Sequence, residues 1–163
     1  MLKISSITRG FDREKFDCGS EPLNAFLKAF AFQSQAKSAS RTYILHSEDT
    51  DNTILGFYTL VLCTVVSEQL PRPYSNKYKP SIPGINLARL AVDKKYQGKG
   101  FGAILLSNAL KQILRVSEIA GAAACFVDAK EGARDFYINY GFTPLNSNPD
   151  RLFLPIKTIK ELF

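Results

Sequence analysis

The chain is poor in histidine and cysteine, the side chains that most often act as general bases or hold metals. It has one histidine, His46, and three cysteines, Cys18, Cys63 and Cys125, which lie far apart and form no C-x-x-C pair. An odd number of separated cysteines indicates neither a disulfide framework nor a zinc site. The composition therefore favours a reducing cytoplasm and predicts no metal centre.

Long apolar runs are also missing. No stretch approaches the roughly 18 apolar residues that a membrane span needs, and residues 1–6 lack the apolar core of a signal peptide. We therefore expect a chain that neither crosses a membrane nor is exported. Hydrophobic residues at 45% and charged residues at 22% are ordinary for a globular protein, so we expect one domain that covers residues 1–163 and has a buried core.

The positive charge is unevenly placed. Between positions 72 and 115 the chain has nine basic residues and one acidic residue, Asp93, so this segment carries a charge of +8. The net charge of the whole chain is +6, so the remaining residues together carry −2. The nine are Arg72, Lys77, Lys79, Arg89, Lys94, Lys95, Lys99, Lys111 and Arg115. A basic block of this kind favours an anionic partner, with nucleic acid the usual candidate. A solvated surface without a partner, and a cofactor whose phosphates take up the charge, both remain open at this point.

Hydrophobic periodicity predicts a mixed α/β order, with hairpin strands first and β-α-β-α-β afterwards. The first expected element is a helix that starts near Ser20 or Glu21 and buries Leu23, Phe26, Leu27 and Phe30. Strands at 41–46 and 53–65, joined by a turn at 47–52, and a long proline-marked loop at 67–84 follow it. The remaining elements are a strand at 85–92, a helix at 102–116, a strand at 122–127, a helix at 131–140 closed by Gly141, a strand at 152–154 and a short terminal helix.

A glycine-rich turn, Gln-Gly-Lys-Gly-Phe-Gly at 97–102, joins the expected strand at 85–92 to the expected helix at 102–116. A helix N-terminus after such a turn presents free N–H groups and a positive dipole end, which together bind anions. The spacing is not that of a P-loop. It is also not that of a dinucleotide fingerprint, because Glu118, about 20 residues on, falls in or just after a helical stretch.

The pattern Gln-x-x-Gly-x-Gly after a strand resembles the acetyl-CoA signature of the GNAT acyltransferases. The segment at 133–142, Ala-Arg-Asp-Phe-Tyr-Ile-Asn-Tyr-Gly-Phe, is similar to the "FY…GF" block near the C-terminus of that family. Within the family, the chain is most similar to the acetyltransferase toxins of bacterial toxin–antitoxin pairs. The closer match rests on Phe16-x-Cys18-Gly19 with Leu23-x-x-Phe26-Leu27, on Gly56-x-Tyr58-Thr59-Leu60, on residues 87–93 and on Leu152-Phe153-Leu154-Pro155, with Ala88 where such toxins often have glycine.

The resemblance implies a single-domain GNAT fold, an α/β structure with a mixed, mostly antiparallel central sheet flanked by helices, and acetyl-CoA as cosubstrate without a metal. It implies that Leu90, Ala91 and Val92 pair with the pantetheine arm. It further implies that the backbone amides of Gln97, Gly98, Lys99, Gly100, Phe101 and Gly102 hold the pyrophosphate. Tyr137, the tyrosine of the "FY" block, is then the expected general acid, which protonates the departing CoA thiolate or holds it by a hydrogen bond.

No general base is evident, since the place of His46 at the end of a strand does not favour catalysis. A lysine amine with a pKa of about 10.4 is only about 0.1% neutral at pH 7.5, whereas an α-amine with a pKa of about 7.7 to 8.0 is roughly a quarter to two-fifths neutral. An α-amine can therefore attack unaided. Together with the basic block and the toxin-like motifs, this predicts aminoacyl-tRNA as acceptor and acetylation that stops translation. The expected RNA-binding residues are Arg89, Lys94, Lys95, Lys111 and Arg115.

The toxin resemblance also implies a restraining partner, a small ribbon-helix-helix antitoxin whose tail would contact Arg89, Lys94, Lys95 and Lys99. Whether the chain forms a homodimer stays open. Two other functions remain open as well. One is a GNAT enzyme that acetylates a small amine or a protein N-terminus, and the other is a CoA- or RNA-binding regulator without catalysis.

Overall fold

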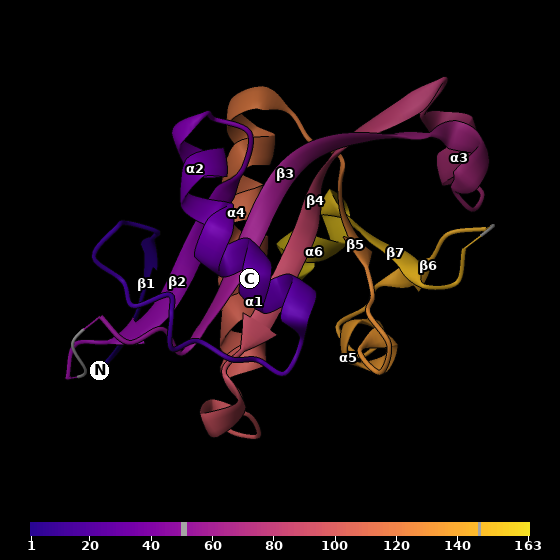
Figure 1. Ribbon diagram of the computed structural model, residues 1–163. Helices are drawn as coiled ribbons and strands as arrows, with labels where there is room; N and C mark the ends of the chain where they lie inside the picture. Colours follow the sequence, from indigo (N-terminus) through magenta and orange to yellow (C-terminus); the bar gives the residue numbers. More distant parts are fainter. Residues whose placement is uncertain (50–51, 147) are drawn as a thin grey trace. The chain divides into compact units, whose positions relative to one another are not determined.

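The computed structural model describes residues 1–49, 52–146 and 148–163 (Figure 1). The described chain divides into two compact units, one formed by Met1–Val61 with Ala88–Ala109 and the other by Leu62–Leu87 with Leu110–Phe163. We refer to them as the first and second units and describe each by itself. Two predicted turn residues, Thr50 and Asp51, lie outside the described residues.

The expected strands and helices occur in the predicted order, together with short elements at 2–6, 31–36, 74–77 and 143–144 that the sequence did not predict. The strands are β1 (Leu2–Ser6), β2 (Arg41–Ser47), β3 (Gly56–Val66), β4 (Ser81–Val92), β5 (Ala124–Asp128), β6 (Thr143–Pro144) and β7 (Arg151–Pro155). The helices are α1 (Glu21–Ala29), α2 (Ala31–Ala36), α3 (Tyr74–Lys77), α4 (Phe101–Ala120), α5 (Arg134–Ile138) and α6 (Ile156–Leu162), with short 3-10 turns η1 (Ser67–Gln69) and η2 (Lys94–Tyr96). No helix among the described residues is both long and apolar enough to cross a membrane.

The strands form a seven-stranded sheet in the order β1-β2-β3-β4-β5-β7-β6. The pairs β1/β2, β2/β3, β5/β7 and β6/β7 are antiparallel, whereas β4 and β5 are parallel. A parallel pair needs a crossover connection, and α4 supplies it between β4 and β5. This confirms the expected mixed, mostly antiparallel sheet.

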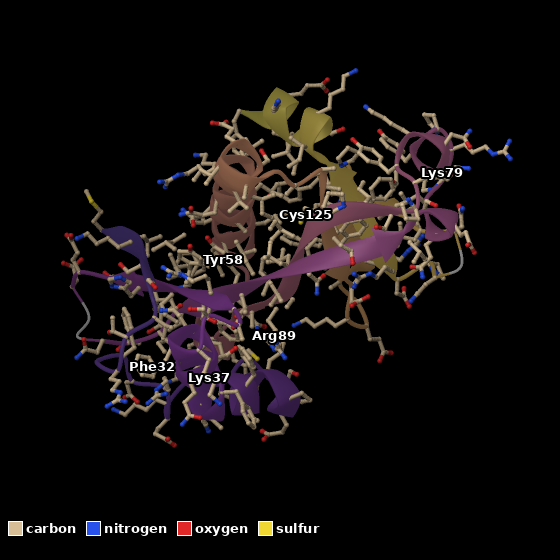
Figure 2. All side chains as sticks on the ribbon, turned by 90° about the horizontal axis from the view of Figure 1, so that it is seen from above. Phe32, Lys37, Tyr58, Lys79, Arg89 and Cys125 are labelled. Atoms are coloured by element: carbon tan, nitrogen blue, oxygen red, sulfur yellow. The ribbon has the colours of Figure 1, made fainter. Side chains whose placement is uncertain are left out.

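In the first unit, neighbouring side chains of β3 point to opposite faces of the sheet, as the pleat requires. The Phe57 ring packs 5.5 Å from that of Phe16 and 6.4 Å from that of Phe26 on α1. The Tyr58 hydroxyl instead donates a hydrogen bond to Asn108 Oδ1 on α4. Figure 1 shows α1 and α2 across β2 and β3, and Figure 2 shows the labelled Tyr58 on the opposite side from α1. Helices thus cover both faces of these strands.

In the second unit, aromatic side chains of β5 and β7 form the centre of the core. The Phe126 and Phe153 rings stack 6.1 Å apart, and the edge of Tyr74 packs 5.3 Å from Phe153. The backbone of β4 passes so close to Phe126 that a Cβ at Gly84 would lie 2.5 Å from its ring. Position 84 therefore requires glycine. The buried members of this cluster are Val65, Leu70, Ile82, Ala124, Phe126, Leu145 and Phe153.

The predicted loop at 67–84 is wrong in part, because it contains η1, α3 and the beginning of β4. Prolines made the segment resemble a connector, yet β4 runs through Pro83. A strand tolerates proline where its missing N–H is not needed by the ladder. Pro83 contributes through its carbonyl, which accepts a hydrogen bond from Ala123 N at 2.8 Å.

The helix boundaries also differ from expectation. Helix α4 extends four residues beyond the predicted end at 116, whereas α5 is shorter than the predicted 131–140. Gly141 adopts φ +98°, as the predicted helix stop requires. Phe30 was expected on the buried face of the first helix, but this is wrong. The helix ends at Ala29, so the periodicity stops there and Phe30 is 59% exposed at the break before α2.

Candidate functional site

The turn that follows β4 is held in place by side chains at both of its ends. Asp93 accepts hydrogen bonds from Lys95 N at 2.9 Å and from Asp17 N at 3.1 Å. The Gln97 side chain donates to Val92 O at 2.9 Å and to Cys18 O at 3.3 Å. Gln97 therefore fixes the turn to the end of β4, which leaves its backbone amide as the group that could contact a ligand.

The glycines of the turn have the backbone that an anion cradle needs. Gly98 and Gly100 adopt φ +79° and +82°, and an added Cβ at either would meet nothing within 4 Å. The first hydrogen bond of α4 runs from Ile104 N to Gly100 O at 3.2 Å, so the amides before it lie outside the helix ladder. Free amides, open space and the positive end of the helix dipole together fit a pyrophosphate. Gly102 lies in the first turn of α4.

The end of β4 leads directly into this cradle. Ala91 is buried in the core of the first unit, while Leu90 and Val92 are half-buried. The neighbouring strand approaches so closely that a Cβ at Gly56 would lie 2.8 Å from Ala91 O. β4 pairs in parallel with β5 through residues 84–87, which lie opposite 124–127. Because β4 continues to Val92, its last residues lie beyond this paired segment.

Basic side chains near the turn have local partners that fix their positions. The Arg89 guanidinium lies 3.6 Å from the centre of the Phe26 ring, and burial lowers the Arg89 pKa. Figure 2 shows Arg89 on the side of β4 that faces α1. Lys94 Nζ lies 3.6 Å from Asp17 Oδ2, and Lys99 Nζ lies 5.7 Å from the centre of the Tyr96 ring. The predicted contacts Arg89, Lys94, Lys95 and Lys99 thus all belong to the first unit.

Tyr137, the predicted general acid, belongs to the second unit and is only 6% exposed. Its ring packs edge-on against Phe136 and Phe142, with ring centres 5.1 and 5.5 Å away. Burial, with a smaller contribution from Cys125, raises the pKa of Tyr137 well above its usual range. The phenol is therefore protonated at physiological pH, so it can donate a hydrogen bond or a proton but does not act as a phenolate base.

The other two predicted RNA contacts also lie in the second unit. Lys111 and Arg115 are exposed one turn apart on α4, where residues four apart lie on the same face of the helix. The basic block that is continuous in the sequence is thus divided in the structure. Arg72, Lys77, Lys79, Lys111 and Arg115 belong to the second unit and the other four basic residues to the first.

Sequence reasoning missed Asn86 on β4. Among the described residues, its Oδ1 is the one buried side-chain nitrogen or oxygen without a hydrogen-bond partner. Leaving such an acceptor unsatisfied costs about 1–3 kcal/mol, which an N–H donor of a bound ligand would offset. The available signal was an amide side chain between Ile85 and Leu87 in an otherwise apolar part of the strand.

The side chain of His46 packs against neighbouring residues of the first unit. Its Nε2 lies 2.8 Å from Ser5 Oγ on β1, and its ring packs edge-on against Phe11 at 5.0 Å. Burial lowers the pKa of His46, with a smaller effect from Lys3. In the described part of the chain, no cluster of histidine, cysteine, aspartate and glutamate could hold a metal ion.

Comparison with known proteins identifies the family. The profile described as "Acetyltransferase (GNAT) domain" matches residues 38–144. The "tRNA-acetylating toxin" of Mycobacterium tuberculosis is 30% identical over 93% of this chain and 90% of its own length. Two solved structures are similar over nearly their whole length.

One of these structures is AtaT complexed with acetyl-methionyl-tRNAfMet, with a TM-score of 0.92 and 35% identity over 100% of this chain and 99% of that one. The other is a tyrosine-to-phenylalanine mutant of AtaT bound to acetyl-CoA and the C-terminus of the antitoxin AtaR. Its TM-score is 0.84, with 35% identity over 99% of this chain and 98% of that one. The chain therefore belongs to the GNAT family of acetyltransferases.

Proposed function

We propose that this protein transfers the acetyl group of acetyl-CoA to the α-amine of an aminoacyl-tRNA and thereby blocks translation. The observation that carries the proposal is its likeness, over the whole chain, to AtaT in complex with acetyl-methionyl-tRNAfMet. The open anion cradle at Gly98 and Gly100 supports it independently, because a CoA ester needs such a site for its pyrophosphate.

In this proposal the cofactor lies along the end of β4. The amides of residues 97–102 receive the pyrophosphate, and Leu90, Ala91 and Val92 offer backbone groups to the pantetheine arm. Asn86 Oδ1, buried without a partner, is available to an N–H donor of the cofactor or of the acceptor amine. Arg89, Lys94, Lys95 and Lys99 supply positive charge in the same unit as the cradle.

The chemistry is attack of a neutral amine on the thioester carbonyl, followed by loss of CoA as a thiolate. A free thiol has a pKa of about 8.5, so the thiolate is a tolerable leaving group. The Tyr137 phenol stays protonated because burial raises its pKa, and it would stabilise that thiolate by donating a hydrogen bond. No general base is required before the attack, because an α-amine is substantially neutral near pH 7.5, and the proton that its nitrogen loses as the amide forms passes to solvent water.

The proposal predicts a definite pH dependence. With aminoacyl-tRNA as acceptor, kcat/KM should rise with pH as the α-amine loses its proton, and then level off above about pH 8. Since a raised pKa keeps Tyr137 protonated at higher pH than an ordinary tyrosine, no loss of activity should follow up to about pH 9.5. Initial rates between about pH 6 and 9.5 test this. A steady rise to the highest pH would show that a group with a higher pKa than the α-amine controls the rate, and a decline below about pH 9 would exclude a neutral Tyr137 as donor.

Partners follow from the same proposal. Because AtaT is bound by the C-terminus of the antitoxin AtaR, we infer an antitoxin for this chain as well. We further propose that it is a ribbon-helix-helix protein whose acidic tail meets Arg89, Lys94, Lys95 and Lys99, since opposite charges steer association. Aminoacyl-tRNA as substrate places the reaction in the cytoplasm, and a homodimer is compatible with the proposal.

The direct test is to incubate the pure protein with acetyl-CoA and total charged tRNA and to analyse the 3′-terminal aminoacyl-adenosines by mass spectrometry. An acetyl group on the α-amine supports the proposal. Induction of the chain alone in a bacterium should arrest growth. Normal growth with soluble protein that binds acetyl-CoA would refute the toxin assignment, and acetylation of only a polyamine or a protein N-terminus would favour the alternative enzyme.

A further inference from the structure

A cavity of about 690 Å³ lies in the second unit, bordered by α3, the C-terminal end of α4 and α6. None of the predicted cofactor or catalytic residues lines it. Its volume is within the range of about 300–1,000 Å³ that is usual for small-ligand sites. The cavity is therefore large enough for a ligand that the GNAT chemistry does not by itself assign.

Its lining is positively charged. Lys77 on α3 and Lys157 and Lys160 on α6 line the cavity and are exposed, against a single carboxylate, that of Glu118. In the described part of the chain, no ion pair joins any of these lysines to a carboxylate. Lys77 Nζ instead lies 5.5 Å from the centre of the Tyr78 ring. The three ammonium groups are thus available to an anionic ligand.

Two tyrosines form aromatic walls beside these lysines. Tyr74 is fixed by its edge-on contact with Phe153 at 5.3 Å, and Tyr78 N donates to Tyr74 O at 3.0 Å. Aromatic faces next to flexible cations are the combination that binds nucleotides, because bases stack on rings while lysines neutralise phosphates.

The exposed basic residues of α4 share a helix face with one residue that lines the cavity. Lys111, Arg115 and Glu118 follow one another at i, i+4 and i+7, which places them on one side of the helix. Glu118 lines the cavity, and Lys111 Nζ lies 5.1 Å from the ring of Phe163, which follows α6. The predicted RNA contacts at 111 and 115 therefore lie on the side of α4 that carries Glu118, a residue of the cavity lining.

We propose that this cavity binds a nucleotide segment of the acceptor RNA, with phosphates at Lys77, Lys157 and Lys160 and a base or ribose against Tyr78. The proposal rests on the proposed function and deepens it. It assigns recognition of the RNA, as distinct from recognition of the aminoacyl group, to this cavity. The basic stripe on α4 then guides the adjoining phosphates.

The test compares the double variant Lys157→Gln/Lys160→Gln with the unmodified protein, using purified uncharged tRNA and fluorescence anisotropy between about 0.05 and 0.3 M salt. We expect the affinity to fall about tenfold or more at about 0.1 M salt. The slope of log affinity against log salt should decrease by about 1.4 to 1.8, the value for two lost phosphate contacts. Calorimetric affinity for acetyl-CoA should be unchanged. The matched control is Lys28→Gln/Lys37→Gln, which removes the same charge from exposed positions of the first unit.

The outcomes are separable. Unchanged tRNA affinity and slope in a folded cavity variant overturn the proposal, and so does an equal loss in the control, which would indicate a dependence on net charge alone. If the cavity variant kept its affinity for tRNA and lost affinity only for an acidic peptide, the cavity would be a protein-binding site, and this result would also overturn the proposal. Acetylation of charged tRNA by the unmodified protein tests the proposed function separately, since tRNA binding at the cavity can be measured whether or not acetyl transfer occurs.

Discussion

Replacing Tyr137 by phenylalanine should reduce acetyl transfer by about 10²- to 10⁴-fold, the usual loss when a positioned proton donor is removed. The substitution removes one hydroxyl and keeps the ring that packs against Phe136 and Phe142. We therefore expect a folded protein with nearly unchanged acetyl-CoA affinity. Single-turnover rates and calorimetry separate the two quantities, and induction of the variant should no longer arrest growth.

A matched control lies nearby. Tyr140, just after α5, is half-buried and its ring centre lies 5.5 Å from that of Phe136. Tyr140→Phe removes the same atom from the same segment and should leave turnover within about twofold. If Tyr137→Phe retained turnover within about threefold of the unmodified protein, the thiolate would have to be stabilised by another group, and Tyr137 would be a packing residue.

Replacing Gly100 by valine should weaken acetyl-CoA binding by about 10- to 100-fold. A side chain there would fill the open space beside the turn and displace the pyrophosphate from two or three amides, each of which contributes about 0.3 to 1 kcal/mol. A Cβ at position 100 would meet no protein atom within 4 Å, so the loss should come from the ligand and from backbone strain at φ +82°. Isothermal titration with acetyl-CoA measures it.

Strain must be separated from ligand exclusion. Gly121, at the end of α4, has the same φ of +82° and equally open surroundings. Gly121→Val therefore carries the same backbone cost, about 1–2 kcal/mol, without touching the proposed cradle. Both variants should lose similar thermal stability, and only Gly100→Val should lose acetyl-CoA affinity. Equal affinities in the two variants would contradict the assignment of the turn.

Much of the fold could be predicted because its strongest patterns are local. The β-branched and aromatic residues of β2 and β3, the helical pattern of α4 and the helix stop at Gly141 depend on residues close in the sequence. Edge strand β1 was not predicted, because its residues 2–6 acquire their strand from pairing with β2, about forty residues away along the chain. The prediction that Phe30 is buried was wrong because α1 ends at Ala29, so the helical spacing of apolar residues no longer determines where Phe30 lies.

The candidate functional site likewise has features that depend on local sequence and features that depend on packing. The open glycine turn at Gly98 and Gly100 could be predicted from the sequence, because a glycine-rich segment before a helix is a local pattern, and its role in binding acetyl-CoA stays a prediction. The unsatisfied oxygen of Asn86 could not be predicted, because only the packed strand shows that this atom is buried without a partner. Nor could the sequence show that the basic block is shared between two units, because charge along a chain says nothing of how a strand and a helix divide it.

The fixing of the turn to the segment before α1 has a consequence for protein design. Asp93 and Gln97 hold the turn by bonding to the backbone of Asp17 and Cys18, which lie in a separate part of the sequence. The glycine cradle is therefore not a portable motif. A transplant of residues 93–102 into another scaffold would carry the glycines without the contacts that hold them, so a working graft must include the segment around 17 and 18 as well.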